Sequence, residues 1–414
     1  MSQAPPCTFR AKQAGSRQPL LQAALVIVLS GVSYAWSINL IPAREALSRN
    51  LALPEQMLIQ VLNEIAENRT KAALVQLDEL LSLNPNFKLA QLIKGDLLLA
   101  RTRAIDSLGA GAPADRVGDL RDEARARLAR HTFQPPQKLA PRYLLELPQD
   151  HRYALVMDAS RSTLFVFANT DNGPRYVADF YMTVGKNGTA KVREGDKRTP
   201  LGVYRVTGKM SRDKLTDFYG SGAFPIDYPN EWDRIHGRNG HGIWLHGTPL
   251  DTYSRPPRAS DGCIVLANDD LEALEQYLQF GTTPVVIADS VEWAPAEEIA
   301  RLRTELLKHV ERWRGDWESR DTEVYLGNYS KRFSANGADW SKWAAQKRQV
   351  NSAKSWIKVE VRDVSLVLYP GEDSLAVATF EQDYASSNLS NRMKKRQYWI
   401  KEDGRWRILF EGAA

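Results

Sequence analysis

The sequence predicts a multi-domain α+β protein. Its 414 residues exceed what one hydrophobic core normally serves, so two or three domains are expected. An uncharged apolar stretch near the N-terminus precedes a region of helical periodicity. Short strand-like runs with glycine and proline fill the middle, and a long amphipathic helix precedes longer strands at the C-terminal end. These patterns predict a membrane segment, a helical region, a β-sandwich domain and a C-terminal α+β domain.

Composition sets broad limits on function. Apolar residues make up 43% and charged residues 25% of the chain, as in ordinary globular proteins. The net charge of +5 is mild, and the charges of both signs are spread along the chain. No nucleic-acid recognition motif accompanies them, so no nucleic-acid partner is expected. The positive balance fits a weak attraction to an anionic polymer or surface.

The N-terminus has the features of a membrane-targeting segment. Residues 18–43 contain no Asp, Glu, Lys or Arg, and Arg10, Lys12 and Arg17 precede them. Positive charge before an apolar stretch keeps that flank in the cytoplasm and sends the following chain across the membrane. We therefore expect a cytoplasmic tail at 1–19, an anchor or signal peptide at 20–41, and a periplasmic or cell-envelope location. Ser33-Tyr34-Ala35 offers a cleavage site, so both forms stay open, although the length of the stretch favours an anchor.

Residues 46–131 have the periodicity of paired helices. Leucine, valine and isoleucine recur at helical spacing on both sides of a break at Asn84-Pro85-Asn86. The pattern resembles one and a half tetratricopeptide-like repeats, fewer than a solenoid needs. A spacer bundle is therefore favoured over a peptide-binding groove. The prolines of 132–149 indicate a linker.

Residues 150–289 have the pattern of a β-sandwich. Apolar runs occur at 153–158, 164–168, 176–184, 202–207 and 284–288, separated by turn residues. Asn268 stands where a side-chain cap would begin a helix over 269–279.

The stretch from Ile243 to Leu266 carries the residues of a thiol nucleophile. The chain has two cysteines, Cys7 and Cys263, and the membrane segment separates them. An unpaired thiol on the oxidising side is a liability unless it has a use. His246 can serve as its base, and Gly262 lets the chain turn so that the Gly262 and Cys263 amides can hold an oxyanion.

The order of these residues resembles the L,D-transpeptidase (YkuD-type) family. Its mark is His246-Gly247, a loop, and then Ser260-Asp261-Gly262-Cys263, with GDKRTPLGVY upstream at 195–204. The resemblance implies Cys263 as nucleophile, His246 as base and the Gly247 carbonyl as the group that orients the imidazole. It implies peptidoglycan stem peptides as substrate and no cofactor. Many relatives have arginine two residues after the nucleophile, where this chain has Val265.

Further substrate contacts are expected around this site. The side chains concerned are Ser260, Lys197, Arg198, Trp244 and Tyr253. Lys197 and Arg198 are equally well explained as solvated hairpin charges. Three histidines at five-residue spacing, 236, 241 and 246, lack companion cysteines or carboxylates, so no metal is expected.

The C-terminal region, 295–414, predicts a helix and a strand meander. Apolar residues from Ile299 to Trp313 recur at helical spacing, and long strands are expected over 356–368, 375–384, 393–401 and 406–410. This arrangement resembles the nuclear transport factor 2-like (SnoaL-like) cone. Its aromatic residues line a pocket or fill the core, and the core is favoured. They are Trp340, Trp343, Trp356, Tyr398 and Trp399.

Together the two domains resemble the cell-shape L,D-carboxypeptidases of helical bacteria. The leading hypothesis is a cysteine-dependent L,D-transpeptidase acting on tetrapeptide stems in wall remodelling and cell shape, with cell-wall proteins as possible partners. An alternative is an L,D-carboxypeptidase that trims tetrapeptide to tripeptide. An alternative of another class is a non-catalytic wall-binding scaffold. An activated thiol should react with alkylating probes at mildly acidic pH, whereas a scaffold's thiol should behave like any free cysteine.

Overall fold

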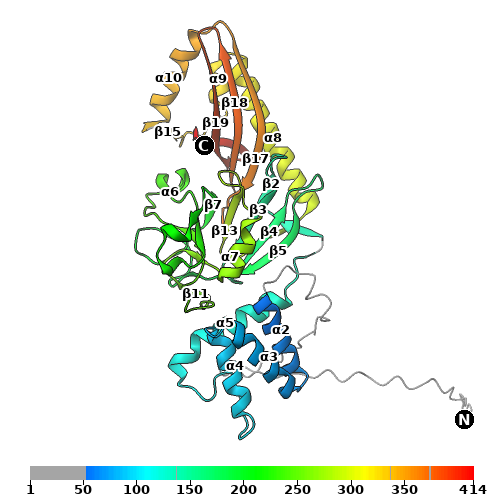
Figure 1. Cartoon of the computed structure of the whole chain (residues 1–414). Coiled ribbons are helices and arrows are strands. Elements are labelled where there is room, and N and C mark those ends of the chain that lie inside the picture. Colours follow the sequence, from blue (N-terminus) through cyan, green and yellow to red (C-terminus); the bar gives the residue numbers. More distant parts are fainter. Residues whose placement is uncertain (1–52, 137, 336, 373) are drawn as a thin grey trace, which may run out of the picture.

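The chain folds into three parts that follow one another along an elongated molecule (Figure 1). The computed structural model describes residues 53–414 except 137, 336 and 373. The predicted cytoplasmic tail and membrane segment, 1–41, lie outside the described residues. Within the described part, no helix combines the length and the apolar character that crossing a membrane requires.

The N-terminal part is a bundle of four helices. Helices α2 (Leu53–Ala66) and α3 (Thr70–Leu83) form a hairpin, and α4 (Lys88–Leu99) and α5 (Ala114–Thr132) complete the bundle. Apolar side chains at helical spacing meet in one small core, which includes Leu58, Val61, Leu77, Leu80, Phe87 and Ile93.

The middle part is built from two main sheets that share a core. One has the strand order β5-β4-β3-β13-β7 and the other β12-β10-β9-β8, with a two-stranded pair β11-β6 beside them. Apolar residues of both sheets, such as Leu155, Leu245, Ile264 and Val285, fill the space between them.

The strands of the first sheet are β3 (Tyr153–Asp158), β4 (Thr163–Ala168), β5 (Arg175–Tyr181), β7 (Gly202–Arg205) and β13 (Pro284–Ala288). Those of the second sheet and the pair are β6 (Val184–Gly185), β8 (Met210–Ser211), β9 (Gly222–Pro225), β10 (Trp244–His246), β11 (Arg258–Ser260) and β12 (Ile264–Val265).

The proline-rich segment, expected to be a linker, instead joins the other parts. Strand β1 (Leu139–Pro141) pairs with β14 (Trp293–Pro295), and β2 (Leu144–Glu146) pairs with β17 (Ile357–Leu368) of the C-terminal sheet. Backbone pairing with distant strands is invisible in local composition, which is why turn residues alone predict a free connection.

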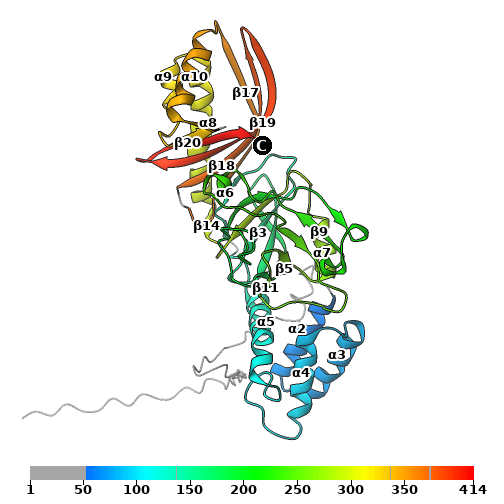
Figure 2. The same cartoon turned by 90° about the vertical axis from the view of Figure 1, so that its left-hand side faces the viewer.

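The C-terminal part has the helix and strand meander predicted from the sequence. Helix α8 (Ala296–Glu318) buries Ile299, Leu302, Leu306, Val310 and Trp313. The sheet curves around α8, α9 (Thr322–Leu326) and α10 (Trp340–Ser352), as Figure 2 shows. Its remaining strands are β18 (Leu375–Ser386), β19 (Leu389–Glu402) and β20 (Arg405–Ala413), and a short pair is formed by β15 (Ser334–Ala335) and β16 (Ala338–Asp339).

Most of the aromatic residues considered as pocket lining are core residues. Tyr398 and Trp399 are fully buried and Trp343 nearly so, whereas Trp356 is half exposed. Tyr398 stacks on Trp232 of the short helix α6 (Glu231–Ile235) in the middle part, with ring centroids 5.8 Å apart. The same helix accepts a hydrogen bond from Arg396 through Glu231 (2.9 Å). These contacts join the two parts into one packed unit.

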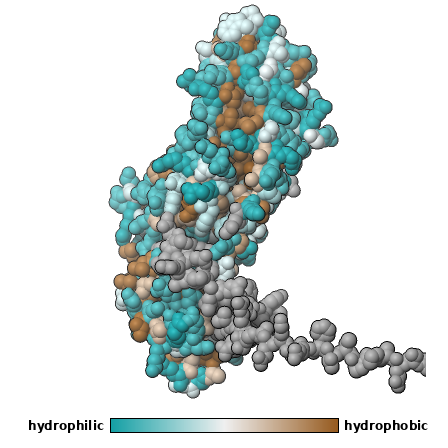
Figure 3. Space-filling model, turned by 90° about the vertical axis from the view of Figure 1, so that its right-hand side faces the viewer, coloured by the Kyte–Doolittle hydropathy of each residue, from teal (hydrophilic) through white to brown (hydrophobic). Residues whose placement is uncertain are grey.

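The molecular surface is mostly hydrophilic on the face shown in Figure 3, with apolar side chains gathered in a band over the C-terminal part.

The helical bundle packs directly against the loop between β10 and β11, residues 247–257. Tyr253 of this loop stacks near Phe87, with centroids 4.3 Å apart, and Ser254 donates a 2.6 Å hydrogen bond to Glu123. The Asn86 side chain also donates to the Leu250 carbonyl (3.3 Å). The bundle is therefore more than a spacer, because it holds one side of a loop that lies beside the candidate site.

Candidate active site

Two neighbouring strands bring His246 and Cys263 together. Strands β10 and β12 run parallel with Leu245 opposite Ile264 and His246 opposite Val265. His246 follows Leu245 and Cys263 precedes Ile264, so both side chains stand on the face opposite to those apolar residues. They are diagonal neighbours on one sheet face, a relation that allows side chains to reach each other.

The imidazole of His246 is held in one tautomer. Its Nδ1 donates a 2.7 Å hydrogen bond to the Gly247 carbonyl, which can only accept, so Nε2 is left as the basic nitrogen. The rings of Tyr219 and Phe218 flank the imidazole at 5.1 and 5.7 Å. Burial, helped by the positive charge of Arg255, lowers the pKa of His246 to about 4, although the hydrogen bond to the Gly247 carbonyl opposes the change. The imidazole is therefore neutral near pH 7 and ready to accept a proton.

The thiol of Cys263 is half-buried and protonated at rest. Its Sγ donates to the Gly242 carbonyl at 3.3 Å. Burial raises the pKa of Cys263, although the Trp244 amide and the charge of Arg255 oppose the rise. The resting pair is thus a neutral thiol beside a neutral imidazole. Fast alkylation at mildly acidic pH, expected for an activated thiol, does not follow from this arrangement.

The turn before Cys263 is closed by Ser260. Its hydroxyl donates to the Cys263 carbonyl (2.6 Å) and accepts from the Gly262 amide (3.1 Å). Ser260, expected to contact substrate, therefore shapes the turn. The Gly262 amide, expected as an oxyanion donor, is committed to Ser260, which leaves the Cys263 amide of that pair. Gly262 has φ +130°, and a Cβ there would lie 2.8 Å from the Arg198 carbonyl oxygen.

The GDKRTP segment, residues 195–200, supports the turn before Cys263 through hydrogen bonds of Thr199. Thr199 is fully buried, and its hydroxyl donates to the Gly262 carbonyl (2.9 Å) and accepts from the Gly185 amide (2.9 Å). This role of Thr199 was not predicted from the sequence, although its position inside the motif was a usable signal.

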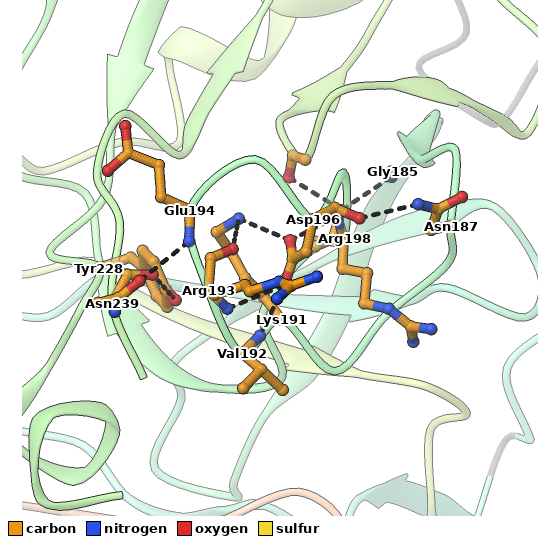
Figure 4. A network of polar contacts seen from close by, with 12 residues as sticks. Gly185, Asn187, Lys191, Val192, Arg193, Glu194, Asp196, Arg198, Tyr228 and Asn239 are labelled. Carbon is orange, nitrogen blue, oxygen red and sulfur yellow. Dashed lines mark hydrogen bonds and ion pairs between the residues drawn. The ribbon is translucent and has the colours of Figure 1, made fainter. Parts of the chain in front are cut away.

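The rest of that loop is folded around Asp196, as Figure 4 shows. The carboxylate accepts hydrogen bonds from Lys191 (2.8 Å) and from the amides of Val192, Arg193 and Arg198. Burial alone would raise the pKa of Asp196, but these four donors together hold it far below its ordinary value.

Lys197 and Arg198 lie on the outside of this loop. Lys197 adopts a positive φ of 56°, and Arg198 donates from Nη1 to the Thr189 carbonyl (3.0 Å). Both line an open groove of about 840 Å³, whose lining residues, 186–198, do not include the thiol. Both side chains are exposed, which fits their interpretation as solvated hairpin charges, although the backbone of Arg198 contacts Gly262 beside the thiol.

Asn268 hydrogen-bonds to the loops beside strand β10, which contains His246, and does not cap a helix. Helix α7 (Asn268–Glu275) has Ala267 at its N-cap. The Asn268 side chain instead accepts from the amides of Ser221 (2.9 Å) and Thr248 (3.1 Å). A Cβ on Gly247 would lie 2.0 Å from its Oδ1, so glycine is required beside His246. Tertiary contact therefore overrides the capping preference.

The two aromatic residues expected at the substrate face differ in position. The Trp244 ring packs against Tyr219, with centroids 5.0 Å apart, beside the imidazole. Tyr253 points the other way, into the core of the helical bundle. The bundle covers the loop on that side, so this position of Tyr253 gives no support to the expected contact with substrate.

Arg255 is the charged residue that the sequence did not single out. Its guanidinium lies over the Phe218 ring at 4.8 Å, and its charge acts on both His246 and Cys263. The loop motif SRPPR holds two arginines, Arg255 and Arg258, and nothing in their spacing tells which of them packs beside the site. Val265, two residues after the thiol, is buried in β12.

The histidines at 236 and 241 take no part in this site. His236 contacts the Trp232 carbonyl through Nδ1 (2.8 Å), and the exposed His241 lies 3.4 Å from Glu194. Across the described ranges, no cluster of three or more His, Cys, Asp or Glu side chains could hold a metal ion.

The fold and the site define the class of protein. Residues 152–287 belong to the L,D-transpeptidase (YkuD) catalytic domain family, and residues 305–412 to the Cds6 C-terminal NTF2-like domain family. The resemblances of the catalytic and C-terminal domains inferred from the sequence are thereby confirmed.

Two solved structures are similar to the chain over both domains. The structure of Bdellovibrio bacteriovorus Bd1075 shares 29% identity with a TM-score of 0.58, covering 67% of this chain and 98% of that one. The helical cell shape determining protein Pgp2 from Campylobacter jejuni shares 28% identity with a TM-score of 0.56, covering 65% of this chain and 95% of that one. A comparison with curated proteins found no match.

Proposed function

We propose that the protein is a peptidoglycan L,D-transpeptidase that works through an acyl-enzyme at Cys263. The observation that carries this proposal is the thiol on the strand beside a neutral imidazole whose Nδ1 is fixed by the Gly247 carbonyl. A base in this tautomer presents Nε2 to the proton of the nucleophile. A non-catalytic scaffold has no need of a buried histidine held in one orientation.

The chemistry follows from these groups. His246 Nε2 takes the thiol proton as Sγ attacks the carbonyl carbon that joins the L-centre of diaminopimelate to the terminal D-alanine. The Cys263 amide holds the negative oxygen of the tetrahedral intermediate. The C–N bond breaks, His246 returns the proton to the leaving amine, and D-alanine departs. A second amine then loses a proton to His246 and attacks the thioester carbon; the C–S bond breaks as the new amide bond forms, and the Cys263 sulfur leaves and regains the proton from His246.

A second candidate is an L,D-carboxypeptidase, in which water takes the acyl group and leaves a tripeptide. It is favoured by the similarity over both domains to a protein described as determining helical cell shape. Both reactions share the acyl-enzyme and differ only in the acceptor. In either case we place the catalytic domain in the periplasm, held by the N-terminal segment as an anchor or released by cleavage of a signal, and acting on cell shape.

Product analysis tests this proposal. The full chain and its Cys263→Ala variant are incubated with a disaccharide-tetrapeptide, with and without excess D-amino acid, and the products are identified by mass spectrometry. Cross-linked dimers or D-amino-acid exchange support the transpeptidase. Tripeptide alone, unaffected by the added amine, overturns the transpeptidase in favour of the carboxypeptidase. Activity of Cys263→Ala within about tenfold of the parent overturns the acyl-enzyme, because loss of a covalent nucleophile costs several orders of magnitude.

A further inference from the structure

Arg255 is a charged residue beside the candidate site that has no role in the proposed reaction. Its guanidinium is half-buried and lies over the Phe218 ring at 4.8 Å, and that ring packs 5.7 Å from the imidazole of His246. Among the residues that the structure describes, the guanidinium has no acceptor within hydrogen-bond distance and no carboxylate within ion-pair distance. The nearby Asp261 pairs with Lys186 instead, at 3.2 Å. An arginine in this setting has five donors available for a ligand.

The backbone of Arg255 is fixed. Its carbonyl accepts hydrogen bonds from the Tyr181 hydroxyl (2.9 Å) and the Thr183 hydroxyl (3.0 Å). Two prolines follow it, and the preceding Ser254 is bonded to Glu123 of the helical bundle (2.6 Å). A residue held from both sides and stacked on an aromatic ring loses little freedom on binding a ligand, which suits a recognition role.

Partial burial strengthens the attraction between this charge and an anion. The guanidinium is removed from part of its water and gains an aromatic neighbour but no hydrogen-bond acceptor, so an anion that reaches it gains more than it would at an open surface. Guanidinium and carboxylate match in geometry and bind through two parallel hydrogen bonds. The group best suited to complete this arrangement is a carboxylate of a molecule that occupies the site.

We propose that Arg255 binds the terminal carboxylate of the residue that leaves, and so directs the enzyme to the last bond of the stem peptide. This inference rests on the proposed function. In a peptide cut at its last amide, the free carboxylate lies one carbon beyond the departing nitrogen, close to the thiol that attacks. A peptide extended or amidated at that end lacks the anion and leaves the guanidinium unpaired.

Alkylation of the thiol tests the subsite without any peptide. Iodoacetate and iodoacetamide have the same reactive carbon, but only iodoacetate has a carboxylate. The rate ratio of iodoacetate to iodoacetamide at Cys263 is measured near pH 8 by mass spectrometry of the peptide that contains it. In Arg255→Ala this ratio should fall about tenfold, because both rates share any change in thiol pKa and only one shares the charge attraction. Arg258→Ala, which removes the exposed arginine that follows the two prolines, should leave it unchanged.

Substrate kinetics provide the second test. With a tetrapeptide ending in a free carboxylate, Arg255→Ala should lower kcat/KM by about 10- to 100-fold, mainly through KM. With the same peptide amidated at its end, the parent and the variant should differ less than about threefold. Arg255→Lys keeps the charge but loses the paired geometry, and should lie between them.

The outcomes separate the two proposals. An unchanged alkylation ratio in Arg255→Ala, with unchanged thermal unfolding, overturns the carboxylate subsite whatever the enzyme does. A lowered ratio without turnover of any stem peptide supports the subsite and overturns the proposed function. Equal loss on carboxylate and amide substrates would show a purely structural role for Arg255, and also overturns the subsite.

Discussion

The depressed pKa of His246 predicts an enzyme that stays active in mild acid. Burial lowers this pKa from 6.5 to about 4, so charging the imidazole costs about 3 kcal/mol more than in water. At about pH 5.5 such a histidine is about 97% neutral, whereas an unperturbed one is only about 10% neutral. The neutral form is the base, so the rate should follow its population.

The assay is the pH profile of kcat/KM, which reports ionisations of the free enzyme. We expect a fall of less than about twofold between about pH 7 and pH 5.5, and an acidic limb centred near 4. An unperturbed base would instead cost about tenfold over the same interval. The alkaline limb should lie above the range of an ordinary thiol, because burial raises the pKa of Cys263.

Stability gives an independent check with a definite sign. The folded pKa of His246 lies below its unfolded value, so the unfolded chain binds the extra proton between about pH 6.5 and 4 and folding is weakened as pH falls through that window. His246→Gln has no such titration. Between about pH 7 and pH 4 its free energy of unfolding should therefore fall by about 2 to 3 kcal/mol less than that of the parent. An NMR titration of His246 with a midpoint near 6.5, together with a tenfold fall in rate by pH 5.5, would refute the reasoning.

Two further predictions concern the supports of the site. Ser260→Ala leaves the buried Gly262 amide without its acceptor, so the free energy of unfolding should fall by about 2 kcal/mol, and an unchanged melting temperature would contradict this role. Ser254→Ala removes the hydrogen bond to Glu123, so amide hydrogen exchange over 248–257 should speed up by about tenfold. The control is Thr252→Ala on the same loop. Its hydroxyl bonds only the neighbouring Asp251, so this variant should change the exchange rate little. Equal exchange in both variants would mean that the bundle does not hold the loop.

The sequence alone identified candidates for the nucleophile, for the base and for the group that orients the base. Thiol acyl transfer requires a small set of residue types, and the order of His246, Gly247 and Cys263 leaves few other interpretations. The C-terminal domain was predictable for a similar reason. Long elements repeat their period often enough to be recognised, as along α8 and β17 to β20.

The tertiary structure decided which way each loop residue faces. Loops have no period, so sequence could not tell that Tyr253 enters the helical bundle while Arg255, two residues later, lies over the Phe218 ring beside His246. It could not tell that Ser260 would take the Gly262 amide, because that hydrogen bond depends on the shape of the turn. Asn268 has the right type for a helix cap, yet the approach of Thr248 gives its side chain better partners. Local chemistry identifies the reacting groups, and packing from distant segments decides what surrounds them.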